Sequence, residues 1–162
     1  MILSTHGIVG SQIQSFVGLL DTYPNAAAAY SVRKLRAAYT GSAIRVRRSS
    51  DNTEQNIGFS GANLDTSALT SFCGSGNGFV TTWYDQSGNG LNVIQTTAAS
   101  QPQIVSSGSV ILQGGKPTLQ FDGSSDFMDG SGVTTGDPKS IFIPTKAISL
   151  PSTETVIFDS VT

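Results

Sequence analysis

The most specific pattern of chemistry-bearing residues in the chain is a run of acid, amide, hydroxyl and glycine residues, Trp83-Tyr84-Asp85-Gln86-Ser87-Gly88-Asn89-Gly90-Leu91-Asn92. A carboxylate that ends a strand can accept hydrogen bonds from backbone N–H groups of the next turn, and glycines allow positive φ there. Asp85, Ser87 and Asn89 also have the spacing of the first half of a calcium loop, but the closing position is Thr96 instead of a bidentate Glu. We therefore expect these three residues to build a turn, with calcium as the alternative, and we assign no metal ligand and no other cofactor.

Other residues that often carry out chemistry are scarce, because the chain has one histidine, His6, and one cysteine, Cys73. A single cysteine forms neither an intrachain disulfide nor a CxxC site. One His and one Cys also fall short of a conventional zinc site, and a histidine in a terminal arm is a poor member of a catalytic triad. Cys73 follows Phe72 in an apolar stretch, which favours a small buried side chain over a nucleophile.

Two adjacent aromatic residues, Trp83 and Tyr84, are candidate sugar-stacking residues. Neighbouring residues on a strand point to opposite faces of a sheet, so only one of the two rings can face a given ligand. The core is the favoured location for Trp83.

Composition indicates how such residues are positioned. The chain has 162 residues, of which 12% are charged and 38% are hydrophobic, and 18 are glycine. This profile is typical of one domain of short strands joined by many turns, and it excludes a coiled coil or a charged disordered tail. The net charge of −2 gives no overall attraction to nucleic acid or to an anionic membrane surface, and we expect neither as a partner.

The hydrophobic pattern predicts helices over residues 25–39 and 63–72, the second capped near Asp65 or Thr66. Short strands are predicted between Gly, Ser, Asp and Pro clusters, at residues 43–47, 56–59, 79–84, 93–96, 103–105, 110–112, 118–121, 141–144 and 155–158. Short strands at spacings of roughly ten residues are typical of an antiparallel sandwich. The expected fold class is therefore mainly β, an antiparallel jelly-roll sandwich with one or two short helices.

Residues 1–20 are expected to form an N-terminal attachment arm, and residues 21–162 the N-terminal portion of a lectin-like jelly-roll domain. The arm lacks the pattern of a signal peptide or a membrane span. Its apolar residues are too many for a solvated tail and should pack on their own domain or on a neighbour: Ile2, Leu3, Ile8, Val9, Ile13, Phe16 and Val17.

Two motifs resemble those of the concanavalin A-like (laminin-G-like) jelly-roll superfamily: residues 84–92, and the run Pro117-Thr118-Leu119-Gln120-Phe121-Asp122-Gly123-Ser124-Ser125-Asp126-Phe127. More narrowly, the stretches at residues 43–51, 63–73 and 83–90 look like the N-terminal part of the catalytic domain of fungal-type α-L-arabinofuranosidase B. The resemblance covers residues 25–160 and is moderately specific for fold.

That family implies two catalytic carboxylates, a nucleophile and an acid/base, in the later half of its jelly roll. No catalytic residue is therefore carried over to this chain. Asp85, Asp122 and Asp126 are the tempting substitutes, but each lies in a Gly/Ser-rich turn where capping of the backbone explains it.

The leading functional hypothesis is a non-enzymatic structural or attachment module of a virion or appendage, such as a phage head or tail fibre. Its expected partners are other copies of itself, other virion proteins and a cell-surface glycan. The grounds are the apolar arm without an export signal, a jelly roll expected to be incomplete at the C-terminus, and the absence of disulfides. The alternative is an extracellular fragment of a glycoside hydrolase related to α-L-arabinofuranosidase. A cell-surface adhesin domain is a third hypothesis.

Overall fold

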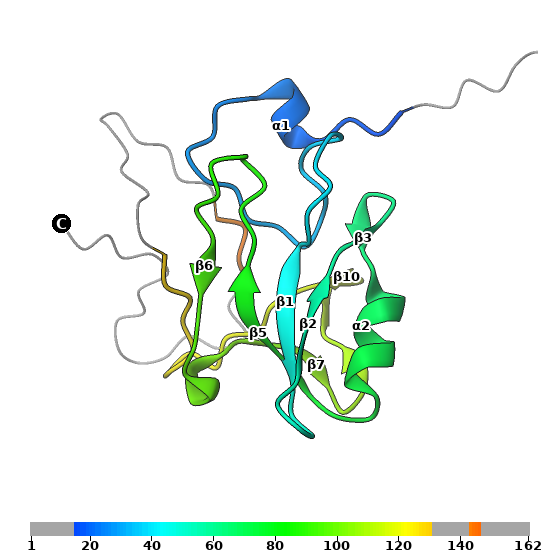
Figure 1. Ribbon diagram of the computed structural model, residues 1–162, viewed down its shortest axis with the longest axis vertical. Helices are drawn as coiled ribbons and strands as arrows, with labels where there is room; N and C mark the ends of the chain where they lie inside the picture. The colour runs from blue at the N-terminus through cyan, green and yellow to red at the C-terminus, as the bar shows by residue number, and fades with distance from the viewer. Residues whose placement is uncertain (1–14, 131–142, 147–162) are drawn as a thin grey trace, which may run out of the picture.

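The computed structural model describes residues 15–130 and 143–146. At its centre is a six-stranded antiparallel sheet, shown in Figure 1. Its main path runs β2 (Glu54–Ile57), β1 (Ile44–Arg48), β5 (Gly78–Trp83), β7 (Gln103–Ser106) and β8 (Ser109–Val110), and β6 (Val93–Ile94) pairs with the other half of β5. Two hairpins flank it, β3 (Phe59–Ser60) with β4 (Asn63–Leu64), and β9 (Leu112–Gln113) with β10 (Lys116–Pro117).

The helical content of the described residues is small. It consists of α1 (Leu19–Thr22), α2 (Thr66–Cys73) and a 3₁₀ turn at Ala98–Ser100. The mainly-β, antiparallel fold class with two short α-helices is thus confirmed, and the arrangement is consistent with a β-sandwich. Within this part of the chain no helix has the length and apolar character needed to cross a membrane.

One face of the sheet is buried. In β1 the buried Ile44 and Val46 alternate with Arg45 and Arg47 on the other face, as the sequence pattern predicts. α2 covers part of the buried face, where its Leu69 and Cys73 join residues from β1, β2, β5 and β7. The buried cluster consists of Ala43, Ile44, Val46, Ile57, Leu64, Leu69, Cys73, Val80, Ile104 and Val105.

The helix predicted at residues 63–72 is confirmed at Thr66–Cys73. The Asp65 carboxylate accepts a 2.9 Å hydrogen bond from the backbone N–H of Ala68, which is the cap expected from sequence. The two residues at the start of the prediction belong instead to β4, which pairs with β3. The local capping signal therefore placed the helix to within a few residues.

The prediction of a helix at residues 25–39 is wrong. This segment has no regular helix, Asn25 has φ +74°, and Tyr30 and Arg33 form isolated antiparallel bridges with Asp85 and Asn63. Alanine's helix propensity is worth only a fraction of a kcal/mol per residue. Hydrogen bonds to a distant turn outweigh it, as the next subsection describes.

The remaining strand predictions divide into three groups. Strands occur within or beside six of the predicted ranges, and those near residues 93–96 and 110–112 are shorter than expected. At residues 118–121 only Gln120 pairs, in an isolated bridge with Gln103. The prediction at residues 155–158, the first half of that at residues 141–144, and residues 1–14 of the arm with His6 lie outside the described residues, and residues 143–144 form no strand.

The last residues of the expected arm pack on the chain itself. Leu20 is buried and its backbone N–H donates to the carbonyl of Leu35 at 2.8 Å. The Asp21 carboxylate accepts from the N–H groups of Gly18 and Ala37, and these bonds lower its pKa. Residues 18–21 are thus held against the segment that follows them.

Candidate functional site

β5 ends in a turn whose carboxylate is saturated with hydrogen bonds. Asp85 is 4% exposed; its Oδ1 accepts from the backbone N–H groups of Ala29 and Ser87, each at 2.8 Å. Its Oδ2 accepts from the Ser87 hydroxyl at 2.6 Å and from the backbone N–H of Leu91 at 3.1 Å. Burial opposes ionisation of Asp85, but these bonds outweigh it and hold the pKa below its usual value.

The next residue, Gln86, is fully buried and reaches across to the same distant segment. Its Oε1 accepts from the backbone N–H of Leu35 at 2.8 Å, and its Nε2 donates to the carbonyls of Ser31 and Arg33 at 2.8 and 2.9 Å. Its own backbone N–H donates to the carbonyl of Ala29. Both N–H groups of the Gln86 side-chain amide are thus hydrogen-bonded to backbone carbonyls, and its oxygen accepts from a backbone N–H.

Asn89 completes the arrangement, because its Nδ2 donates to the carbonyls of Ala26 and Ala27 at 3.1 and 2.9 Å. We call the side chains of Asp85, Gln86 and Asn89 the clasp. Figure 1 shows the loop between β5 and β6 reaching toward the segment between α1 and β1 that the clasp holds. These bonds satisfy backbone groups that a helix at residues 25–39 would have paired internally.

The sequence pointed to Asp85 and Asn89 as turn residues but missed Gln86. A glutamine beside a turn is ordinarily exposed, and no local pattern shows that its partners lie more than fifty residues away. The Asp85 oxygens point at N–H and O–H donors, which is the geometry of a turn. Within the described residues there is no group of three or more His, Cys, Asp or Glu side chains that could hold a metal ion.

The two aromatic residues before the clasp lie in different surroundings. Trp83 packs against the buried cluster, with its ring centroid 6.0 Å from that of Tyr30, and its buried Nε1 has no hydrogen-bond partner in the described part of the chain. The Tyr84 hydroxyl donates to Oδ1 of Asn56 at 2.9 Å. Sugar stacking by either ring remains a prediction.

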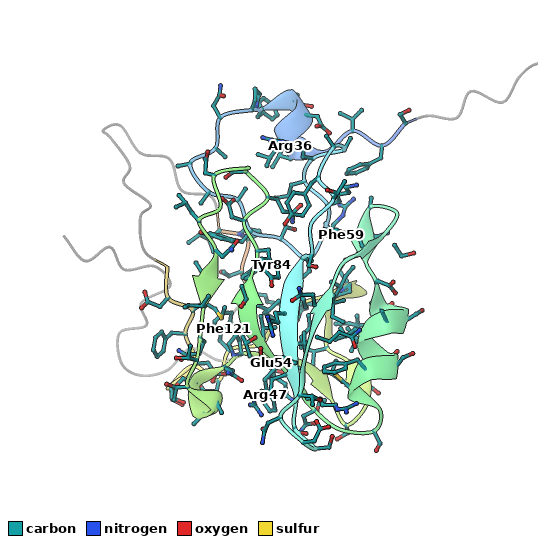
Figure 2. The ribbon with its side chains drawn as sticks, in the orientation of Figure 1. Arg36, Arg47, Glu54, Phe59, Tyr84 and Phe121 are labelled. Atoms are coloured by element: carbon teal, nitrogen blue, oxygen red, sulfur yellow. The ribbon has the colours of Figure 1, made fainter. Side chains whose placement is uncertain are left out.

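The outward face of the sheet carries two cross-strand rows of side chains. One row is Glu54, Arg47, Phe79, Gln103 and Gln120, and the other is Asn56, Arg45, Thr82, Ile94 and Asp129. Arg45 and Glu54 form an ion pair between the rows at 2.6 Å. Arg47, Glu54 and Tyr84 lie over β1 and its neighbours in the view of Figure 2.

A hollow of about 360 Å³ lies at the end of the first row. It is lined by Phe79, Ala98, Ala99, Gln101, Gln103, Gln120, Asp122 and Asp126. Arg47 lies over the Phe79 ring, 4.9 Å from its centroid, and its Nε donates to Oε1 of Gln101 at 2.7 Å. The sequence singled out the two acids of this hollow but not its aromatic ring and amides, which come together only through strand pairing.

The two acids of the hollow differ in their electrostatics. Oδ1 and Oδ2 of Asp122 accept hydrogen bonds from the N–H groups of Ser125, Ser124 and Asp126 and from both serine hydroxyls, and these hold its pKa far below the usual value. Burial, followed by the nearby Asp122 charge, raises the pKa of Asp126, although the N–H of Asp122 donates to it at 3.0 Å. A pair with pKa values driven apart is the pattern of an acid/base site, but Asp122 is already occupied by its turn.

The sequence profile of the family described as "Alpha-L-arabinofuranosidase B, catalytic" matches residues 20–115, more than half of the chain. The chain belongs to this family. The arabinofuranosidase likeness expected from the stretches at residues 43–51, 63–73 and 83–90 is therefore confirmed.

Members of the arabinofuranosidase B family with curated names show the same relationship. "Probable alpha-L-arabinofuranosidase B" of Aspergillus terreus is 34% identical over 101 residues, which cover 58% of this chain and 20% of that protein. "Alpha-L-arabinofuranosidase B" of Aspergillus oryzae is 35% identical over 96 residues, which cover 55% and 19%. The chain thus spans about a fifth of the length of these relatives.

Two solved structures are similar to part of the chain. A crystal structure of an arabinofuranosidase complexed with arabinofuranosyl-α-1,2-xylobiose is similar with a TM-score of 0.46 and 34% identity, over 49% of this chain and 18% of that one. A GH54 α-L-arabinofuranosidase soaked with a cyclic sulfate inhibitor has a TM-score of 0.43 and 32% identity, over 48% and 17%.

The expectation of a virion or phage fibre module is wrong. The matched family and the named relatives are arabinofuranosidases, which is the alternative weighed from sequence. The virion hypothesis rests on an apolar arm without an export signal, on a jelly roll expected to be incomplete and on the absence of disulfides. None of these three features identifies a partner.

Proposed function

We propose that the protein is a glycoside hydrolase that acts on α-L-arabinofuranosides, and that residues 15–130 are a scaffold part of its catalytic domain. The observation that carries this proposal is the family match over residues 20–115. In this proposal, the glycan partner expected from the sequence is the substrate. An extracellular location, the alternative weighed from sequence, belongs to the same proposal.

The proposed scaffold role rests on the hydrogen bonds and ion pairs of the acidic side chains in the described residues. Glycoside hydrolysis with retention needs a nucleophile and an acid/base, with carboxyl groups about 5–5.5 Å apart. Most described acids are instead engaged in structure, with backbone N–H groups or arginines as partners: Asp21, Asp51, Glu54, Asp65, Asp85 and Asp122. We therefore place the reacting carboxylates outside residues 15–130.

The finer fold class belongs to the same proposal. A concanavalin A-like jelly roll is supported by the turn motifs at residues 84–92 and 117–127 and by the antiparallel sheet with one buried face. The division into an arm at residues 1–20 and a domain at 21–162 also remains a proposal, and the packing of Leu20 on Leu35 favours a boundary earlier than residue 20.

A chimaera tests the proposal. Residues 20–115 of this chain replace the matched segment of the Aspergillus terreus relative, and turnover of an aryl α-L-arabinofuranoside is measured. We expect the folded chimaera to hydrolyse the substrate, because the exchanged segment supplies position and not chemistry. The same chimaera with Asp85→Asn should retain turnover per folded molecule while losing stability.

A folded chimaera without turnover would overturn the scaffold role. Turnover by the 162-residue chain alone that disappears in Asp85→Asn, Asp122→Asn or Asp126→Asn would overturn the placement of the reacting carboxylates. Circular dichroism of each protein separates loss of fold from loss of chemistry.

A further inference from the structure

The chain has two Asn-Gly pairs, Asn77-Gly78 and Asn89-Gly90. In such a pair the backbone nitrogen of glycine can attack the side-chain amide carbon of asparagine, since glycine has no Cβ to hinder the approach. Asparagine is for this reason among the thermolabile residues of proteins. Whether the reaction proceeds in a folded chain depends on backbone freedom and exposure, and the two pairs differ in both.

The pair in the clasp is open to the reaction. Asn89 and Gly90 are both exposed, and Gly90 has φ +74°. Within the described part of the chain the Gly90 N–H donates no hydrogen bond, and no heavy atom lies within 4 Å of the position that a Cβ on Gly90 would take. The attacking nitrogen is therefore unpaired, and the space beside the Gly90 Cα is open.

The other pair is locked at the start of β5. Gly78 is buried, and a Cβ there would lie 2.7 Å from Sγ of Cys73. The backbone N–H of Asn77 donates to Oγ of Ser49 at 3.1 Å, its carbonyl accepts from the N–H of Ser49 at 2.9 Å, and its Oδ1 accepts from the N–H of Ser107 at 2.8 Å. Reaction at Asn77 requires the strand to open first.

We propose that Asn89 is a site of spontaneous covalent modification that loosens the clasp. The Gly90 nitrogen bonds to Cγ of Asn89, the bond from Cγ to the side-chain nitrogen breaks, and ammonia leaves with the proton released from Gly90. Water then opens the resulting succinimide at either carbonyl, which gives aspartate or isoaspartate at position 89. No oxidant, reductant or enzyme is required, and the inference does not depend on the proposed function.

Aspartate or isoaspartate at position 89 cannot make the hydrogen bonds that the asparagine side chain makes. Nδ2 of Asn89 donates to the carbonyls of Ala26 and Ala27, whereas an ionised carboxylate has no proton to donate and would face both carbonyl oxygens. The new negative charge also lies on the same turn as the Asp85 carboxylate. Residue 26 should therefore come free and residue 27 should keep only the 3.4 Å contact of its carbonyl with the Ser87 hydroxyl, while Asp85 and Gln86 still hold residues 29–35.

The experiment compares the two pairs in one molecule. The 162-residue chain is incubated in mildly alkaline buffer below its unfolding temperature, and peptide mapping by mass spectrometry follows conversion at both sites. We expect conversion at Asn89 to be at least about tenfold faster than at Asn77, because Asn89 has only to release the hydrogen bonds of an exposed side chain, whereas Asn77 requires the strand to open. In denaturant the two sites should convert at comparable rates. Equal rates in the folded chain, or the same preference in denaturant, would overturn the proposal.

The effect on the clasp is tested with Asn89→Asp against Asn63→Asp, an exposed position on β4. Cleavage by a protease that prefers small side chains should speed up at residues 26–28 in the first variant and stay unchanged there in the second. Unchanged cleavage at residues 26–28 in Asn89→Asp would show that conversion does not loosen the clasp.

Discussion

The turns at Asp85 and Asp122 use the same residue types to different ends. In each, an aspartate accepts hydrogen bonds from backbone N–H groups and serine hydroxyls that follow it. The partners of Asp122 all lie within four residues of it, and the turn is exposed. Asp85 is buried and also binds Ala29, across fifty-six residues of sequence. An aspartate-serine turn therefore has a local effect or a global one depending on burial and on what else the carboxylate reaches.

The largest expected effect is that of Asp85→Ala. The substitution leaves buried N–H donors without acceptors and detaches residue 29, so we expect the free energy of unfolding to fall by about 2–4 kcal/mol. Urea unfolding followed by the fluorescence of Trp83, the single tryptophan, measures it. Asp122→Ala is the matched control and should cost clearly less. Equal losses in the two variants would mean that the contact with Ala29 adds nothing to the turn.

Gln86→Glu should rank second. The two side chains have nearly the same shape, but the carboxylate replaces the donor that serves the carbonyls of Ser31 and Arg33. Two part-buried carbonyl acceptors then face an oxygen, and we expect a loss of about 2–3 kcal/mol in the same assay. Gln113→Glu, on an exposed strand position, should change stability little. A stable Gln86→Glu protein would show that the segment at residues 31–35 is held by other contacts.

Acid sensitivity should distinguish the wild type from Asp85→Asn. The pKa of Asp85 in the folded chain lies below its ordinary value of 3.8, so the stability that its ionised form contributes is fully present above pH 3.8 and is lost as pH falls through the folded pKa. The difference in unfolding free energy between the two proteins should therefore shrink as pH drops below about 3.8. A constant difference across that range would show that the charge of Asp85 contributes nothing.

The difference between local and long-range contacts also explains which features the sequence predicts. The cap of α2 at Asp65 and the alternation of Ile44, Arg45 and Val46 are encoded within a few residues, and both predictions hold. The clasp is encoded by residues far apart in sequence, so local propensity favours a helix at residues 25–39, where the folded chain has no regular helix. The hollow was missed for the same reason, because Phe79 and Gln120 meet only through β7.

The smallest effect, with the opposite sign, is expected for Asp126→Asn. Burial and the nearby Asp122 charge raise the pKa of Asp126, so at neutral pH its ionised form is less favourable in the folded chain than in the unfolded one. Asparagine keeps an oxygen for the Asp122 N–H and removes the charge, and we expect stability to rise by up to about 0.5 kcal/mol at pH 7. The gain should vanish in acid, where Asp126 is protonated. A marked loss of stability would instead show that the negative charge of Asp126 holds the turn in place, which would make the exposed turn depend on charge as the buried one does.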